Sequence, residues 1–206
     1  MTRAKADDEA IKPYHHGALR EALLAAAERI LARDGVAGLT LRGAAREAGA
    51  SHAAPKNHFD DLTGLLSELA ALGFDRFTDR MLAAAAAVPA PELRLNAIGR
   101  AYVEFAAEEP GLFQLMFRRE RLDATRPALR DAMNRAFAAL LDAVEVAHPN
   151  GADSTIAVAT RRAYAARAWS MVHGYAFLLL DDRLGALLDQ GKIHPMTLLD
   201  DMLELD

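Results

Sequence analysis

The chain has 206 residues, of which 52% are hydrophobic, and this content is enough for a substantial buried core rather than a disordered segment. Its formal net charge is −5 at pH 7, and it has no cysteine, which excludes disulfide bonds, thiolate zinc sites and cysteine nucleophiles. Its apolar runs are far shorter than the roughly 20 residues of a membrane-spanning helix, and no secretory leader opens the chain, so we expect a soluble, cytoplasmic protein with no membrane partner.

Charge is divided unevenly along the chain. Residues 1–60 carry nine Lys and Arg against eight Asp and Glu, whereas the remainder carries 15 against 21. Only the first part can therefore be attracted to the phosphates of a nucleic acid.

Helical periodicity runs through nearly the whole chain, and no segment alternates as a β-strand does. We therefore expect an all-α fold. The first apolar stripe predicts a helix that ends near Gly35, because glycine suits the left-handed conformation that closes many helices. A second helix of about two turns follows, with Thr40 as its cap and Gly49 as its stop.

A third short helix is expected directly after this glycine turn. Ser51 can cap a helix running through His52 to His58, and Phe59 supplies the bulky apolar side chain that three small helices need to share one core. Two short helices joined by a glycine turn and braced by a longer one are the layout of a helix-turn-helix, whose second short helix enters the major groove of DNA. Helix hairpins of this kind also occur in proteins that touch no DNA, so the spacing alone leaves both interpretations open.

The candidate DNA contacts lie on and around these two short helices. Asparagine can pair with adenine and alanine can touch a thymine methyl, so His52, Ala53 and Asn57 are the side chains placed to meet base edges. Lys56 and His58 would face phosphates instead. The full set of expected DNA-binding residues is Thr40, Arg42, Ser51, His52, Ala53, Lys56, Asn57 and His58.

The rest of the chain predicts six further helices. The first of these starts after Asp60-Asp61, which favour a helix start, stops before Pro89 and would connect the two parts of the molecule. The six are expected at about residues 62–87, 92–108, 110–118, 126–147, 154–181 and 196–205.

Soft and aromatic side chains are concentrated in this second part. Such residues line apolar ligand pockets of about 300 to 1,000 Å³, although they more often form plain core. Trp169, His173 and Phe177 share one helical stripe, which either lines a pocket or fills the core. The candidate pocket residues are Tyr102, Phe105, Phe113, Met116, Phe117, Asn134, Phe137, Trp169, His173 and Phe177.

Two segments resemble a known family. The segment from Gly17 to Leu66 resembles the DNA-binding region of TetR family repressors, and a later one looks like the tryptophan-histidine-glycine motif of one TetR C-terminal subgroup. The residues that carry these resemblances are Ala-Ala-Glu-Arg-Ile-Leu, Asp34-Gly35, Leu39-Thr40-Leu41-Arg42, Ala48-Gly49-Ala50-Ser51, Asn57-His58-Phe59 and Leu65-Leu66, and then Ala168-Trp169-Ser170-Met171-Val172-His173-Gly174.

The resemblance implies a domain order and a set of partners. It implies an N-terminal arm at 1–16, a three-helix DNA-binding domain at 17–61, and a larger helical domain at 62–206 for ligand binding and dimerisation. The partners it implies are double-stranded operator DNA, a partly apolar small-molecule effector and a second copy of the chain. We therefore expect a ligand-responsive repressor that a small molecule releases from a pseudo-palindromic operator, with no cofactor and no metal site.

Two positions depart from the family pattern. Lys56 stands where the family usually has tyrosine and Leu62 where it usually has lysine, and both family residues commonly touch phosphate. Lys56 can make a charge-assisted contact, but Leu62 cannot. The alternative is therefore a helical ligand-binding or interaction protein that has lost specific operator binding. No metal-ligand spacing, phosphate loop or nucleophile motif favours an enzyme.

Overall fold

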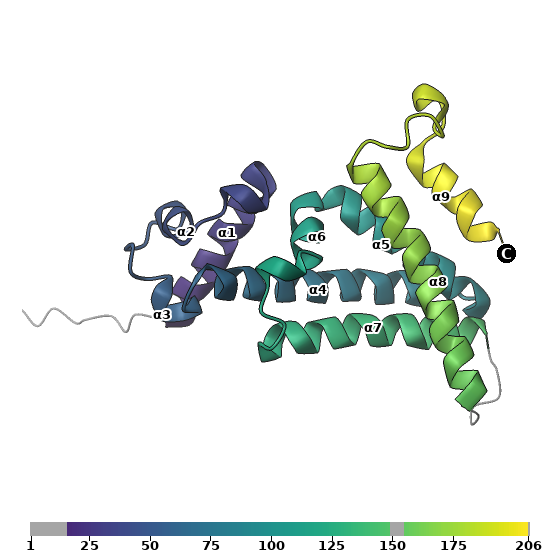
Figure 1. Cartoon of the computed structure of the whole chain (residues 1–206), viewed down its shortest axis with the longest axis horizontal. Helices are drawn as coiled ribbons and strands as arrows, with labels where there is room; N and C mark the ends of the chain where they lie inside the picture. The colour runs from purple at the N-terminus through teal and green to yellow at the C-terminus, as the bar shows by residue number, and fades with distance from the viewer. Residues whose placement is uncertain (1–15, 149–154, 206) are drawn as a thin grey trace, which may run out of the picture.

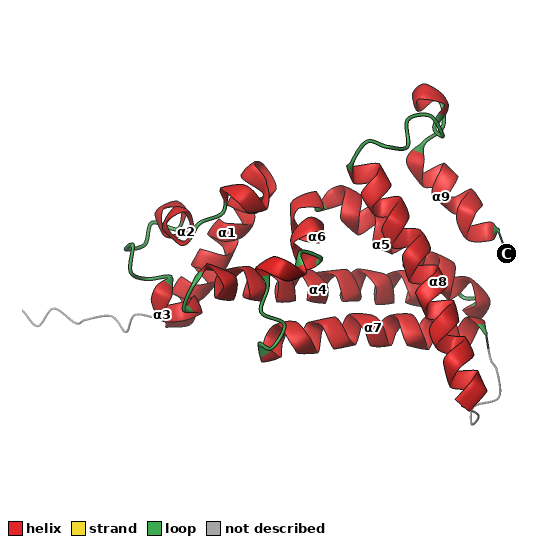
Figure 2. Cartoon of the chain, viewed as in Figure 1, coloured by secondary structure: helices red, strands yellow, loops and turns green. Residues whose placement is uncertain are grey.

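The computed structural model describes residues 16–148 and 155–205, and all regular structure within these ranges is helical (Figure 2), which confirms the predicted all-α fold. Of the expected N-terminal arm at 1–16, residues 1–15 lie outside the described residues. The helices are α1 (His16–Gly38), α2 (Leu41–Glu47), α3 (Lys56–Phe59), α4 (Leu62–Ala87), α5 (Arg94–Glu108), α6 (Pro110–Met116), α7 (Pro127–Ala147), α8 (Thr155–Leu180) and α9 (Pro195–Glu204), with short 3-10 turns at Pro91–Leu93, Arg119–Arg121 and Asp189–Gly191.

The helices are arranged around α4. Helices α1, α2 and α3 form one end of the molecule, α4 runs from that end to the other, and α7 lies alongside it (Figure 1). Helices α5 and α6 pack on α4 as well, while α8 packs on α5 and α7, and α9 packs on α5. Within the described residues, no helix is long and apolar enough to cross a membrane.

Helix α4 joins the two ends because it is buried along most of its length. Asp61 caps it by accepting a hydrogen bond from Gly64 N at 2.8 Å. Leu65 and Leu69 are fully buried near its start, and Phe77 and Met81 are buried further along. One continuous apolar core therefore extends through both parts of the molecule.

The third helix is shorter than expected, which corrects one prediction. Residues 52–55 form a turn, α3 covers only Lys56–Phe59, and its N-cap is Pro55, so Ser51 does not cap it. Proline has no N–H and disfavours a helical conformation in the residue before it. The helix therefore begins after Pro55 rather than at His52.

The other predicted boundaries differ by smaller amounts. The first helix is interrupted at Gly35, whose φ of 69° and ψ of −176° are not helical, and continues for a short turn to Gly38. Thr40 caps α2 as expected, since its side chain accepts a hydrogen bond from Gly43 N at 3.0 Å. The connection expected between the helices at 126–147 and 154–181 lies, after His148, outside the described residues.

The packing of Phe59 generates a stability prediction. Its side chain is 0% exposed, whereas Phe137 on α7 is 49% exposed. We expect Phe59→Ala to lower the free energy of unfolding by about 3 to 5 kcal/mol because it opens a cavity in the core. Phe137→Ala is the matched control and should cost about 1 kcal/mol or less. Urea denaturation followed by circular dichroism measures both, and equal losses would contradict the burial argument.

Candidate nucleic-acid interface and internal cavity

The predicted DNA-contacting residues lie together at the end of the molecule formed by α1, α2 and α3 (Figure 1). All of them except His58, which is half-buried, have exposed side chains. Thr40 and Arg42 belong to the start of α2, the next three to the segment before α3, and the last three to α3 itself. The exposed seven are Thr40, Arg42, Ser51, His52, Ala53, Lys56 and Asn57.

The positively charged residues of this surface differ from those on α1 in whether they form ion pairs within the described part of the chain. Arg29 and Arg33 on α1 both lie within ion-pair distance of Glu47, at 3.2 and 3.7 Å. Among the described residues, Arg42 and Lys56 have no acidic partner within that distance. Their charges are consequently available to an anion outside the chain, such as a phosphate.

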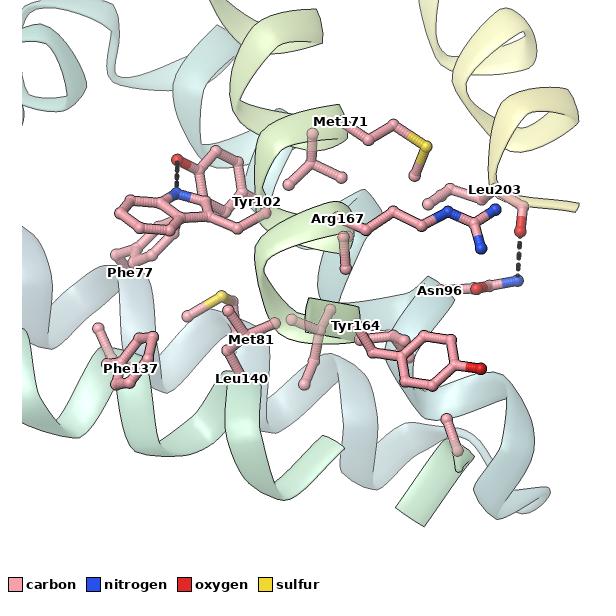
Figure 3. Close-up of a pocket in the computed structure, with 18 of the residues that line it drawn as sticks. Phe77, Met81, Asn96, Tyr102, Phe137, Leu140, Tyr164, Arg167, Met171 and Leu203 are labelled. Atoms are coloured by element: carbon pink, nitrogen blue, oxygen red, sulfur yellow. Dashed lines mark hydrogen bonds between the residues drawn. The ribbon is translucent and has the colours of Figure 1, made fainter. Parts of the chain in front are cut away.

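A cavity of about 980 Å³ lies between α4, α5, α7 and α8 (Figure 3). Its wall is mostly apolar, and five of the seven methionines of the chain contribute to it. The aromatic and methionine lining residues are Phe74, Phe77, Tyr102, Phe117, Phe137, Tyr164, Trp169, Met81, Met116, Met133, Met171 and Met202.

The charged side chains that line the cavity are all exposed to solvent. The acidic and basic residues in its lining are Glu92, Arg119, Arg167 and Glu204, and all four are exposed. Arg167 lies on the side of α9, beside Leu203 and away from Phe77 and Phe137 (Figure 3). Among the described residues, no buried charged side chain therefore lines the cavity.

One chain of hydrogen bonds enters this apolar wall. Trp169 Nε1 donates to Tyr102 Oη at 3.3 Å, and Tyr102 Oη is 2.6 Å from His173 Nδ1. Burial raises the pKa of Tyr102 and lowers the pKa of His173, so both groups are neutral near pH 7. In the tautomer with the proton on Nε2, His173 Nδ1 accepts from the Tyr102 hydroxyl. A phenol oxygen has two lone pairs, so in that tautomer Tyr102 Oη accepts from Trp169 and has one acceptor position left.

The structure brings most, but not all, of the predicted pocket residues to the cavity. The six that line it are Tyr102, Met116, Phe117, Asn134, Phe137 and Trp169. Phe105 and Phe113 are fully buried behind the wall, and His173 contacts the lining residues Tyr102 and Phe117 without lining the cavity itself. Phe177 lines a separate hollow of about 330 Å³.

The contribution of α4 to the cavity was missed in the sequence. Phe74, Phe77 and Met81 stand at positions i, i+3 and i+7 of this helix, which places them on one face. That periodicity is visible in the sequence, but we expected the helix at 62–87 only to connect the two parts of the molecule. Within the described residues, no group of three or more histidine, aspartate or glutamate side chains is placed to hold a metal ion.

Comparison with known proteins gives both family and structural matches. Residues 95–200 match the family described as "Tetracyclin repressor-like, C-terminal domain". A protein of unknown function from Rhodococcus sp. RHA1 is 35% identical, covers 93% of this chain and 96% of its own, and superimposes with a TM-score of 0.73. No curated protein matches the sequence.

Two structures of regulators share the fold at lower identity. The TetR family transcriptional regulator PfmR from Thermus thermophilus is 20% identical, with 78% of this chain and 95% of that chain covered and a TM-score of 0.53. A Shewanella sp. PV-4 protein assigned to the same family is 17% identical, with 90% and 95% covered and a TM-score of 0.60. At these identities the likeness concerns the fold alone.

The burial of His173 generates a pH prediction. Because its pKa in the folded protein lies below the usual value of 6.5, the unfolded chain binds a proton first as the pH falls. The contribution of His173 to stability is therefore fully present above pH 6.5 and is lost as the pH falls toward the folded-state pKa. We expect the free energy of unfolding, measured by urea denaturation, to fall less between about pH 7.5 and about pH 5.5 for His173→Asn than for the wild type. Identical pH dependence would contradict this.

Proposed function

The chain belongs to the TetR family of DNA-binding transcription regulators, and we propose that it binds an operator as a homodimer and leaves it when a small molecule enters the cavity. The observation that carries the ligand response is the apolar cavity of about 980 Å³ on the helix that also supports the DNA-binding end. Its volume is within the range of about 300 to 1,000 Å³ that is usual for small-molecule sites.

The DNA contacts that we propose come from the surface of α2 and α3. Two copies would place their α3 helices roughly 34 to 36 Å apart, one turn of B-form DNA, on a pseudo-palindromic site. The unpaired cations Arg42 and Lys56 would meet phosphates, and Asn57 with His52 and Ala53 would face base edges. Leu62 packs against the core instead of facing outward as a charged side chain would.

The exposed face of α8 supports the proposal of a homodimer. A line of small side chains runs along it, which would let a second helix approach closely. In a two-fold interface the same face serves both copies, so this line would meet its own equivalent. It consists of Ala159, Ala163, Ala166, Ser170 and Gly174, all of which are exposed.

The cavity favours a ligand whose buried part is uncharged. An unpaired charge placed between Phe77 and Phe137 would lose its hydration without gaining a partner, which is costly. Aromatic rings and methionines make favourable contacts with flat or flexible apolar groups. With His173 protonated on Nε2, Tyr102 Oη offers one acceptor position, and for that tautomer we expect the ligand to present a hydrogen-bond donor there.

The alternative function is a helical ligand-binding or interaction protein that has lost specific operator binding. The net charge of −5 and the presence of Leu62 favour it. A mobility shift on the DNA that flanks its own gene separates the two, because operator binding through phosphates must weaken as the salt concentration rises.

The proposed phosphate contact of Lys56 gives a quantitative test. We expect Lys56→Ala to weaken operator binding and to reduce the slope of log affinity against log salt by about 0.9, the value for one lost contact. Lys192→Ala is the matched control, since Lys192 pairs with Asp189 at 3.0 Å near α9 and should leave the slope unchanged. Binding that is absent, or that does not depend on salt, would favour the alternative function.

The expected neutrality of the ligand can be tested with two fluorescent probes that differ in one sulfonate group. They are 1-anilinonaphthalene and its 8-sulfonate, and energy transfer from Trp169, the single tryptophan of the chain, reports their entry. We expect the neutral probe to bind at least about tenfold more tightly, because the sulfonate would be buried without a partner. Equal or reversed affinities would contradict the proposed ligand class and would favour ligands held by Arg119 or Arg167.

A further inference from the structure

The segment between α6 and α7 forms part of the cavity wall. Arg119, Leu122 and Ala124 all line the cavity, and so does Leu129 in the first turns of α7. We name residues 119–126 the wall segment. A molecule in this part of the cavity would touch the wall segment directly.

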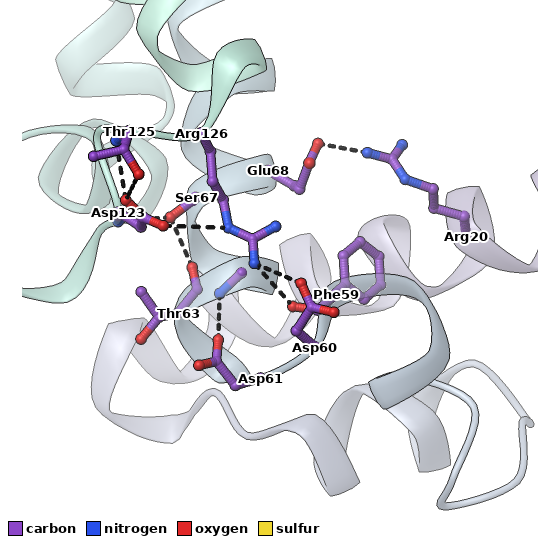
Figure 4. Close-up of polar contacts among 11 residues, drawn as sticks. Arg20, Phe59, Asp60, Asp61, Thr63, Ser67, Glu68, Asp123, Thr125 and Arg126 are labelled. Atoms are coloured by element: carbon purple, nitrogen blue, oxygen red, sulfur yellow. Dashed lines mark hydrogen bonds and ion pairs between the residues drawn. The ribbon is translucent and has the colours of Figure 1, made fainter.

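The wall segment is also hydrogen-bonded to α4 near the DNA-binding end. Asp123 N donates to Ser67 Oγ at 2.9 Å, and Ser67 Oγ donates to the carbonyl oxygen of Thr63 at 2.7 Å (Figure 4). Ser67 is only 1% exposed. A polar side chain buried to this extent needs its partners, so a displacement of Asp123 would be felt in the first turns of α4.

The last residue of the wall segment, Arg126, reaches the end of α3. Its Nη2 donates to Asp60 Oδ2 at 2.9 Å and to the carbonyl oxygen of Phe59 at 3.4 Å (Figure 4). The carbonyl end of a helix carries partial negative charge, which a cation stabilises. Asp60 has a φ of 65°, a left-handed conformation that is unfavourable for any residue other than glycine. Arg126 therefore stabilises a strained helix end.

This junction has little free space. A Cβ atom at Gly64 would lie 1.9 Å from the carbonyl oxygen of Phe59 and 2.7 Å from Arg126 Nη2. Among the described residues, Arg126 Nε is buried without a hydrogen-bond partner, and it forms an ion pair with Asp123 Oδ2 at 3.8 Å. The guanidinium of Arg126 consequently lies between two acceptor groups, one at the end of α3 and one in the wall segment itself.

From these contacts we infer that Arg126 is a positioning residue for DNA binding, which links the contents of the cavity to the placement of α3. The inference rests on the proposed function and names the route by which the ligand acts. A ligand that presses against Leu122 and Ala124 moves Asp123. Arg126 then leaves the end of α3 and pairs with Asp123 instead. The end of α3 consequently loses the hydrogen bonds that Arg126 donates to it. Operator binding falls because the helix must be ordered again when it meets DNA.

The first experiment compares operator affinity among variants of the full-length protein. We expect Arg126→Gln to weaken binding about tenfold while leaving the salt slope unchanged, since Arg126 touches no phosphate. Asp60→Asn should weaken it about twofold, although it removes a negative charge near DNA and would strengthen binding if charge alone mattered. The control is Arg130→Gln, because Arg130 is 57% exposed and, within the described part of the chain, pairs only with its neighbour Asp131. A reduced salt slope for Arg126→Gln would overturn the inference.

The second experiment measures coupling directly. Linkage requires that DNA and cavity ligand alter each other's affinity by the same factor. We expect operator DNA to weaken binding of neutral 1-anilinonaphthalene to the wild type by at least about fivefold. In Arg126→Gln, and in Arg126→Lys, which keeps the charge but loses the forked geometry, the factor should fall below about twofold.

The possible outcomes distinguish the proposed ligand response from the proposed role of Arg126. No coupling in the wild type would count against the proposed ligand response itself. Coupling that is present in the wild type and undiminished in both Arg126 variants would overturn the role of Arg126 and leave the proposed function standing. Thermal melting of each variant shows whether the protein is folded. If Arg126 acts only on stability, the ratio of probe affinities with and without DNA is the same in the variants as in the wild type.

Discussion

The burial of α4 against two successive groups of helices is the constraint on which the rest of the structure depends. Near its start the helix packs against α1 and α3, and further along it packs against α5 and α7. Because interiors are close-packed, a helix buried in this way moves as a unit or not at all. The small helices at one end and the cavity at the other therefore share a common support, while the wall segment supplies a second connection through Arg126 and Ser67.

The cavity combines an apolar wall with very few oriented polar groups. Tyr102 Oη is held by Trp169 on one side and His173 on the other, so the position of this oxygen is fixed. Phe77 packs edge-on against the same ring, with centroids 4.8 Å apart. A site of this kind discriminates by shape and by one hydrogen bond rather than by charge, which is typical of sites for apolar ligands.

The sequence predicted the elements well and the site less completely. Helix α4 has the expected bounds because its apolar run is long and is bounded by Asp61 and the prolines after it. The predicted start of α3 was wrong because Pro55 disfavours a helical conformation in the residue before it, and this effect outweighs the capping potential of Ser51. Among the pocket candidates, Phe105 and Phe137 look alike in sequence, and only tertiary packing buries one and exposes the other. The role of Arg126 depends on residues 66 positions apart and has no local pattern.

The concentration of methionines in the cavity wall bears on the proposed ligand response, because it would separate binding of a ligand from release of DNA. A methionine side chain has three rotatable bonds and little directional preference, so it can move aside without displacing its helix. Under the proposed response, small ligands would be accommodated by Met81, Met133 and Met171 alone, and the backbone would stay in place. Only a ligand too large for this adjustment would press on the wall segment. Ligand size, more than affinity, would then decide which bound molecules release DNA, and tightly bound small molecules would compete without releasing it.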